Sequence, residues 1–457
     1  MRWVLVCSVL FVVACSDDNK HAGAIVDMGR VDDVRSDVLT NDASSSDAST
    51  QPDLSLPDPG ECAAKFSEGL ALGLDPSGES GQFYSASGFD GANIWVVYNR
   101  PESAEVRDEA IFVVRLGCDG EVLTAPTQIS PAGADARNYS PTMASRNGRT
   151  YVVWVHQPNG GNEKQLLYVG FRADGSRLVS EPIDITPAIG DEPLSETIWQ
   201  PDLAAGDDGA TLVAEVLGTE TQVVLERFAP DGTVLQTFLA NEEKGVDQKS
   251  PSVGVDRDNI TWVVWTRYRA ADPNTNTVEE PDSPAYVSYE GSSTVPREGA
   301  PVVFPAAGDQ IPLTTVSPLA GPNGEMFMAY HYVAPRQSLL AVRQLGVEGN
   351  VSTGAGTPAN LNFRPSVVSS DGGGAVAWYR YTTSPLKNSV VLQAFAVGNN
   401  RLELGPETVV LPTYDAMPPY GPGLVALEND DYFVTYTQGA TAPQTRVFGR
   451  FVRATRP

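Results

Sequence analysis

Histidine is scarce in this chain of 457 residues, which contains only His21, His156 and His331. The sequence also has no GxSxG nucleophile turn, no HExxH zinc motif, no Walker phosphate loop and no complete dinucleotide fingerprint. These absences argue against the common serine-hydrolase, zinc-peptidase and nucleotide-dependent enzymes. No catalytic residue and no cofactor is predicted from motifs.

Cysteine and positive charge are also in short supply. The four cysteines form no CxxC pair or Cys/His cluster, which argues against a zinc site. The pair Asp256-x-Asp258 is predicted to lie in a hairpin turn, so no metal site is assigned to it. Lys and Arg number 31 against 57 Asp and Glu, a net charge of −26. This charge argues against nucleic acid and against direct adhesion to anionic lipid headgroups.

No segment is typical of a long helix, whereas short strand-like runs recur along the chain. In each repeat a proline precedes an apolar run, and an aromatic residue follows 12 to 14 positions later. The pairs are Pro141 and Trp154, Pro251 and Trp265, Pro318 and Tyr330, Pro365 and Trp378, and Pro422 and Tyr436, with Pro201 leading to Glu215 and a proline-free copy from Ser85 to Tyr98. Apolar β-branched runs of this length predict strands that are covered on both faces.

The turns and the remaining prolines predict four strands in each repeat. Asp119-Gly120, Asp174-Gly175 and Asp231-Gly232 follow a third strand and suit tight hairpins. A second set of prolines, at 126, 182, 301, 358 and 406, falls near a fourth strand. Because proline cannot donate to a strand ladder, both sets indicate the outer strands of a four-stranded meander.

This pattern resembles the β-propeller, in which four-stranded blades surround a central channel. We predict an all-β fold, a seven-bladed β-propeller over residues 62–457, with six blades as the alternative. A tandem of β-sandwiches would have longer repeats, of about 100 residues. The last repeat ends after its third strand, so a segment from Ala64 to Leu72 is predicted to supply the missing one.

The N-terminus carries a targeting signal. Arg2 precedes an apolar stretch too short to span a bilayer, which ends in Val12-Val13-Ala14-Cys15. This sequence resembles the lipobox of bacterial lipoproteins. The resemblance implies that residues 1–14 are a signal peptide and that Cys15 becomes the lipidated N-terminus, anchoring an exported protein to the membrane. Ser16 after the cysteine favours the outer membrane. Residues 15–61, rich in Asp, Ser and Thr, are predicted to form a disordered acidic tether.

Once Cys7 leaves with the signal and Cys15 is acylated, Cys62 and Cys118 remain. Two remaining cysteines in an exported protein predict one disulfide, Cys62–Cys118.

One set of polar residues suggests a ligand face. They stand two positions beyond the repeat aromatics, where second strands end: Arg100, His156, Arg267, Tyr332, Arg380 and Gln438, with Leu217 at the corresponding place in the third repeat. A ring of Arg, His and Tyr on an acidic protein would attract an anionic or sugar-like ligand. The alternative is that these side chains only cap strand ends.

Two functions follow from these features. The first is a lipid-anchored binding or scaffold module for an envelope glycan or protein partner. The alternative is an extracytoplasmic glycan-processing hydrolase or lyase with its site on the loop face. The scarcity of histidine favours the binding module. A structural lipoprotein with no ligand is a third option.

Overall fold

The structure is a computed structural model, and it is all-β. It describes residues 71–74, 82–101, 109–131, 136–158, 161–190, 192–195, 197–241, 243, 245–268, 282–304, 314–317, 321, 324–334, 337–347, 351–353, 360–383, 386–398, 401–414, 421–427, 430–438 and 445–457. Every regular element in these ranges is a strand, which confirms the predicted fold class. None of the described residues belongs to an apolar helix of membrane-spanning length. The predicted signal, tether and Cys62 lie outside the described residues.

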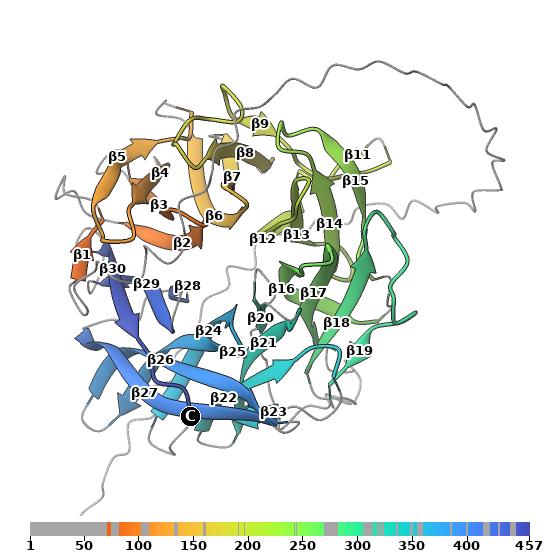
Figure 1. The fold of residues 1–457 in the computed structure, drawn as a ribbon. Coiled ribbons are helices and arrows are strands. Elements are labelled where there is room, and N and C mark those ends of the chain that lie inside the picture. Colours follow the sequence, from red (N-terminus) through yellow and green to blue (C-terminus); the bar gives the residue numbers. More distant parts are fainter. Residues whose placement is uncertain are drawn as a thin grey trace, which may run out of the picture. The chain divides into compact units, whose positions relative to one another are not determined.

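The described strands group into seven four-stranded antiparallel modules (Figure 1). Module 1 consists of β2 (Phe83–Phe89), β3 (Ile94–Pro101), β4 (Glu109–Leu116) and β5 (Val122–Gln128), and module 2 of β6 (Ala136–Arg146), β7 (Arg149–Pro158), β8 (Gln165–Arg172) and β9 (Ile183–Asp184). Module 3 consists of β12 (Ile198–Ala205), β13 (Ala210–Val216), β14 (Gln222–Phe228) and β15 (Val234–Leu239). Module 4 consists of β16 (Asp247–Val255), β17 (Ile260–Tyr268), β18 (Ser283–Glu290) and β19 (Val302–Val303). A single parallel bridge between Glu109 and Arg137 joins modules 1 and 2 into one larger sheet.

Modules 5 to 7 continue the same order of strands. Module 5 consists of β20 (Thr314–Val316), β21 (Phe327–Ala334), β22 (Gln337–Gln344) and β23 (Val351–Thr353). Module 6 consists of β24 (Asn360–Ser370), β25 (Gly373–Thr383), β26 (Leu386–Gly398) and β27 (Arg401–Tyr414). Module 7 consists of β28 (Gly423–Ala426), β29 (Asp431–Gln438), β30 (Arg446–Arg453) and β1 (Ala71–Gly73). A short hairpin, β10 (Ala188–Ile189) and β11 (Glu192–Pro193), lies between modules 2 and 3.

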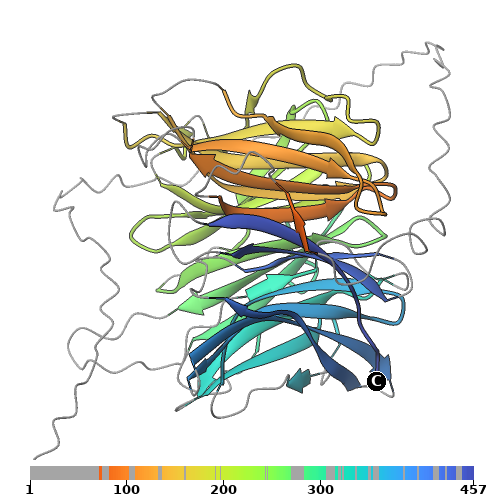
Figure 2. The same cartoon turned by 90° about the vertical axis from the view of Figure 1, so that its left-hand side faces the viewer.

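The first strands of the modules contact one another in a closed cycle. Within residues 55–457, which form one compact unit, the contacts run β2–β6–β12–β16–β20–β24–β28 and back to β2. The other strands of each module lie outside this cycle, so the modules radiate from it (Figures 1 and 2). Among the described strands no sheet closes on itself as a barrel, so the cycle is formed by packing between neighbouring modules.

The core lies between the faces of neighbouring modules. One cluster of buried side chains joins modules 5 and 6, another joins modules 6 and 7, and a third joins module 7 to module 1. The predicted aromatic residues are part of this core: Trp154, Trp265 and Trp378 have no exposed surface. Their apolar surface, about 25 cal/mol per Å² buried, stabilises module-to-module packing.

The register of one first strand corrects a predicted position. In β12 the register moves between Trp199 and Asp202, which sets Glu215 opposite Trp199. Ala214, one residue earlier, therefore stands where the other modules carry the aromatic. In module 5 the residue opposite Tyr330 is Thr314, and the predicted first-strand residue Pro318 lies outside the described residues.

The predicted closing strand is present. β1 pairs antiparallel with β30, with Leu72 opposite Gly449, and completes module 7. The segment 64–70 lies outside the described residues. Cys118 is disulfide-bonded, but the pairing Cys62–Cys118 stays a prediction because Cys62 is not described.

Hydroxyl groups link several of the first strands. The residues at one register position in each module form what we call the inner belt: Ala86, Thr142, Asp202, Ser252, Thr315, Ser366 and Gly423. The Thr315 hydroxyl donates to the Pro365 carbonyl (3.1 Å), and the Ser366 hydroxyl donates to that of Pro422 (2.6 Å). Each of these bonds crosses from one module to the next.

Asp202 is the one carboxylate of the inner belt, and it joins three modules. Its Oδ2 accepts hydrogen bonds from the Ser252 hydroxyl (2.6 Å) and the Val253 N–H (3.1 Å). Its Oδ1 accepts from the Thr142 hydroxyl (3.2 Å). Burial raises the pKa of this carboxyl, and these hydrogen bonds, with one from the Leu203 backbone, oppose that rise.

We expect Asp202→Ala to lower the free energy of unfolding by about 2 kcal/mol, because the Val253 N–H cannot turn to another acceptor. Asp202→Asn keeps one carbonyl oxygen for that N–H and should lose less than half as much. Chemical denaturation of both variants measures the difference. Equal losses for Ala and Asn would mean that the hydrogen bonds of Asp202 do not stabilise the ring.

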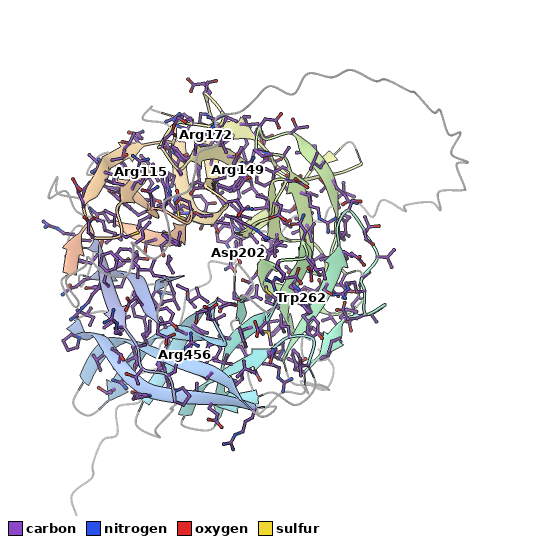
Figure 3. The ribbon with its side chains drawn as sticks, viewed as in Figure 1. Arg115, Arg149, Arg172, Asp202, Trp262 and Arg456 are labelled. Carbon is purple, nitrogen blue, oxygen red and sulfur yellow. The ribbon has the colours of Figure 1, made fainter. Side chains whose placement is uncertain are left out.

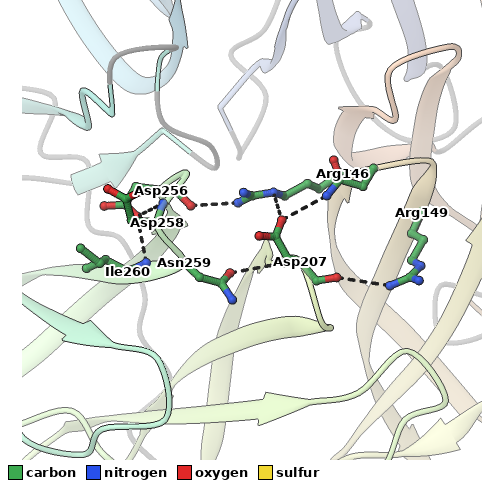
Figure 4. Close-up of polar contacts among 8 residues, drawn as sticks. Arg146, Arg149, Asp207, Asp256, Asp258, Asn259 and Ile260 are labelled. Atoms are coloured by element: carbon green, nitrogen blue, oxygen red, sulfur yellow. Dashed lines mark hydrogen bonds and ion pairs between the residues drawn. The ribbon is translucent and has the colours of Figure 1, made fainter. Parts of the chain in front are cut away.

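A polar network also connects modules 2, 3 and 4 on the face where first and second strands join, the hairpin face (Figure 4). Arg146 forms an ion pair with Asp207 (2.9 Å) and donates to the Asp256 carbonyl (3.0 Å). The Asp256 carboxylate accepts from the N–H groups of Asp258 and Ile260 and from the Trp262 indole. Asp256 therefore stabilises the hairpin turn between β16 and β17, to which it belongs. Among the described residues, no three His, Cys, Asp or Glu side chains are grouped to hold a metal ion.

Candidate functional site

A cavity of about 570 Å³ lies at the centre of the ring. Residues from the first strands of all seven modules, or next to them, line it, including Tyr84, Ser140, Gln200 and Ser250. Asp202 is also in its wall, and Figure 3 shows this residue at the centre of the ring. The size is within the range of ligand pockets, about 300–1,000 Å³. A smaller cavity of about 160 Å³ shares Ser87 with the first.

The wall of the cavity contains strained backbone. Tyr84, Ser140, Gln200 and Ser250 have φ angles of 38°, 50°, 44° and 52°, in the left-handed region that L-residues rarely adopt. Each stands at the bulge of its first strand, in modules 1 to 4. Such residues cost about 1–3 kcal/mol each and cluster at functional sites. The strain therefore marks this part of the cavity wall as a candidate site.

The bulge of module 4 is held by a buried carboxyl. The Ser250 N–H donates to Glu215 Oε1 of module 3 at 2.5 Å. Glu215 is only 5 % exposed, and burial raises its pKa to about 7. A carboxyl that titrates near neutral pH can donate or accept a proton under physiological conditions.

Two neighbouring aromatic rings with a cation at each end lie next to the cavity wall. We call these four residues, Arg137, Tyr139, Trp199 and Lys164, the cation–aromatic row. The Arg137 guanidinium lies 4.6 Å from the centre of the Tyr139 ring, Tyr139 and Trp199 have ring centres 6.0 Å apart, and Lys164 Nζ lies 4.5 Å from the Trp199 ring. Tyr139 and Trp199 directly precede Ser140 and Gln200 of the cavity wall. Trp199 keeps 36 % of its surface exposed.

Polar groups beside this row form an ion pair and hydrogen bonds within modules 1 and 2. Glu109 lies 3.5 Å from Arg137 and accepts from the Asn99 side chain (2.8 Å), and burial raises its pKa. His156 Nδ1 lies 2.9 Å from Asn138 Oδ1, and burial lowers the pKa of this imidazole. The loop face, where second strands end and first strands begin, therefore carries both titratable and aromatic groups.

The six residues predicted as a ligand ring lie near the ends of their second strands. The Arg100 guanidinium lies 3.9 Å from the Phe112 ring, Arg267 Nε donates to Glu243 (2.9 Å), and Arg380 forms an ion pair with Glu407. Gln438 pairs in register with Arg446, and the side chain of Tyr332 is not described. None of the six is among the described residues that line the central cavity. Their ligand role stays a prediction.

Tyr139 and Trp199 were not predicted as site residues, although the sequence carries a signal for them. An aromatic residue stands two positions before the repeat proline in four repeats: Tyr139, Trp199, Phe363 and Tyr420. Tyr139 packs in a core cluster, whereas Trp199 stays partly exposed. The repetition at the start of first strands indicates the loop face.

No protein-family model and no curated protein sequence matches the chain. Among solved structures, the fold is similar to an ulvan lyase of polysaccharide lyase family PL25 with -[GlcA(1-4)Rha3S]- bound, at a TM-score of 0.53 and 9 % identity over 83 % of this chain and 95 % of that one. It is also similar to a protein of unknown function from Dyadobacter fermentans, at a TM-score of 0.50 and 11 % identity over 85 % and 99 %. At these identities the likeness shows the fold alone, an all-β fold that this chain shares with the ulvan lyase.

Proposed function

We propose that the chain is a seven-bladed β-propeller that processes a glycan at the loop-face mouth of its central cavity. Each of the seven modules is one blade in this account, and a six-bladed ring fits the closed cycle of first strands less well. The observation that carries the proposal is the cavity itself, with strained bulges and Gln200 in its wall and the partly exposed Trp199 directly before Gln200 in the chain. Aromatic and amide side chains together suit a sugar ring and its hydroxyls.

The proposed chemistry is hydrolysis or elimination at a glycosidic bond. Both reactions need a proton acceptor and a proton donor at the substrate. Glu215 meets the pKa requirement and lies directly behind Ser250 of the cavity wall. Tyr84, also in the wall, offers a phenol. The ulvan lyase of similar fold acts on a polysaccharide, which supports the same class of substrate here.

A non-catalytic binding module is the second candidate. The inner belt consists mostly of hydroxyl residues, and all donors to Asp202 come from the protein itself. Such a wall can bind sugar hydroxyls without reacting with them. In either case we propose an exported protein, lipid-anchored through Cys15 to the bacterial outer membrane and held off it by the acidic tether, with no role for nucleic acid.

The test uses residues 62–457 as a soluble protein, incubated with neutral and uronate-containing polysaccharides. New reducing ends report either reaction, and the ultraviolet absorbance of an unsaturated uronate reports elimination only. We expect Gln200→Ala to lower turnover about tenfold or more, equivalent to ~1.4 kcal/mol, because it removes a polar group from the cavity wall. Arg401→Ala, an exposed change on β27, is the control.

Binding without new reducing ends would support the binding module instead. Neither binding nor cleavage of any glycan, or equal turnover in Gln200→Ala and wild type, would contradict a glycan site at this mouth.

A further inference from the structure

The cation–aromatic row differs from the other cation–ring contacts of the chain in its extent. It joins two aromatic rings from adjacent modules, Tyr139 on β6 and Trp199 on β12, and places one cation at each end. Lys164 is fixed there by its backbone, whose N–H donates to the Ser195 carbonyl (2.8 Å). The row is therefore built by three separate segments of the chain.

The charge of the row stands out against the rest of the protein. The whole chain carries −26, yet two cations lie here, and the salt-bridge partner that they have among the described residues is Glu109, 3.5 Å from Arg137. Within the described part of the chain, Lys164 forms no salt bridge. Its ammonium group is half-buried, and burial lowers its pKa. Burial removes part of the water around the Lys164 ammonium group. An anion bound beside Lys164 would stabilise the charged ammonium in place of that water.

The position of the row connects it to the proposed site. Tyr139 and Trp199 are followed directly by Ser140 and Gln200, which line the cavity at strained bulges. A bulge redirects side chains relative to a regular strand. A glycan that entered the cavity would therefore extend over the exposed part of Trp199.

We propose that the cation–aromatic row is a subsite for a negatively charged sugar residue of the glycan, in which the ring stacks on Trp199 and the anionic group binds Lys164. This inference rests on the proposed function and deepens it by naming an anionic glycan as the substrate class. The anionic group of the sugar can be a carboxylate or a sulfate ester, because a cation beside an aromatic ring binds either one. The subsite positions the chain and takes no part in bond cleavage.

The experiment measures binding of three oligosaccharides of equal length to the soluble protein, residues 62–457. Unsulfated chondroitin carries carboxylates only. Keratan sulfate carries sulfate groups only, and a cello-oligosaccharide is neutral. We expect one or both charged ligands to bind about tenfold more tightly than the neutral one, with an advantage that shrinks as salt is raised. If only one of the two charged ligands binds more tightly than the neutral one, its anionic group is the one that the row binds.

Two variants assign the effect to the row. Lys164→Gln should weaken binding of the charged ligand about fivefold and leave the neutral ligand unchanged, because only the charge is lost. Trp199→Ala should weaken both by about tenfold, and Trp199→Phe should recover part of that loss because it keeps a ring. Arg401→Gln removes one exposed positive charge from β27, away from the row, and is the matched control.

Equal affinity for charged and neutral ligands would overturn the inference and leave the proposed function intact, provided that the neutral glycan is bound or cleaved at the cavity. A preference for charge that stays about tenfold in Lys164→Gln would overturn it as well. If no glycan is bound or cleaved at all, the proposed function fails, and the subsite fails with it.

Discussion

A chain that begins at residue 77 is expected to be less stable than one that begins at residue 62 by about 3–5 kcal/mol. The shorter chain lacks β1, whose three residues pair with β30 and complete module 7. It also lacks Leu74, which is 2 % exposed and packs in the core cluster that contains Val447 and Phe451. Burial of one leucine contributes about 1.5–3 kcal/mol, and the lost ladder bonds add to that.

The loss should appear in two measurements. Thermal unfolding reports the lower stability, and size-exclusion chromatography reports association, because removal of β1 leaves β30 as an open edge. The shorter chain also loses Cys62, so Cys118→Ser in the longer chain is the control for the predicted disulfide. If the chain from residue 77 matches that control in stability, β1 does not close the ring.

The stability of the protein is expected to fall by about 2–4 kcal/mol between about pH 5 and about pH 8, chiefly because of Glu226 on β14. This side chain is 1 % exposed, and its Oε2 accepts from the Thr237 hydroxyl (2.9 Å). Its Oε1 has no hydrogen-bond partner among the described residues. Burial, and secondarily the charge of Asp184, raises its pKa to about 8 from the ordinary 4.5.

The sign follows from proton binding. Between these two pKa values the folded chain holds a proton on Glu226 and the unfolded chain does not, so rising pH favours unfolding across that window. Glu215, whose pKa is raised to about 7, and Asp282, whose pKa is raised to about 6, act in the same direction.

Glu226→Gln stays neutral at every pH and keeps an oxygen for Thr237. We expect this variant to unfold at a higher temperature than wild type at pH 8 and to show a flatter pH dependence. Glu403→Gln removes a partly exposed carboxylate that is paired with Arg401, and it should leave the dependence unchanged. A pH dependence that is the same in Glu226→Gln and wild type would show that Glu226 is ionised in the folded protein.

Much of the fold was predictable from local patterns. Pro141, Pro201 and Pro251 lie in first strands, as predicted from the missing N–H. Gly120 and Gly232 of the Asp-Gly turns take positive φ angles of 84° and 83°. Each of these features depends on the chemistry of one or two residues.

The error at Glu215 comes from variation in the length of the connection between first and second strands. Trp154 and Trp265 both stand opposite a first-strand bulge, yet they follow Pro141 and Pro251 at different distances. The spacing from Pro201 therefore fits Ala214 and Glu215 equally well, and only the register shows that Ala214 stands opposite the bulge.

The candidate site was harder to predict because it depends on contacts between modules. Tyr139 and Trp199 are 60 positions apart by their residue numbers, and only the packing of β6 against β12 brings their rings to 6.0 Å. The predicted ring of Arg100, Arg267 and Arg380 relied on strand ends alone. Periodicity cannot show that their guanidinium groups contact Phe112, Glu243 and Glu407 instead.

The central claim is that a glycan binds at the loop-face mouth of the cavity, and hydrogen exchange with a bound oligosaccharide tests it most directly. We predict slower exchange in residues 137–142 and 199–203, with little change on the hairpin face around Asp207 and Asp256. Protection confined to the hairpin face, or to the outer strands β5 and β15, would contradict the account.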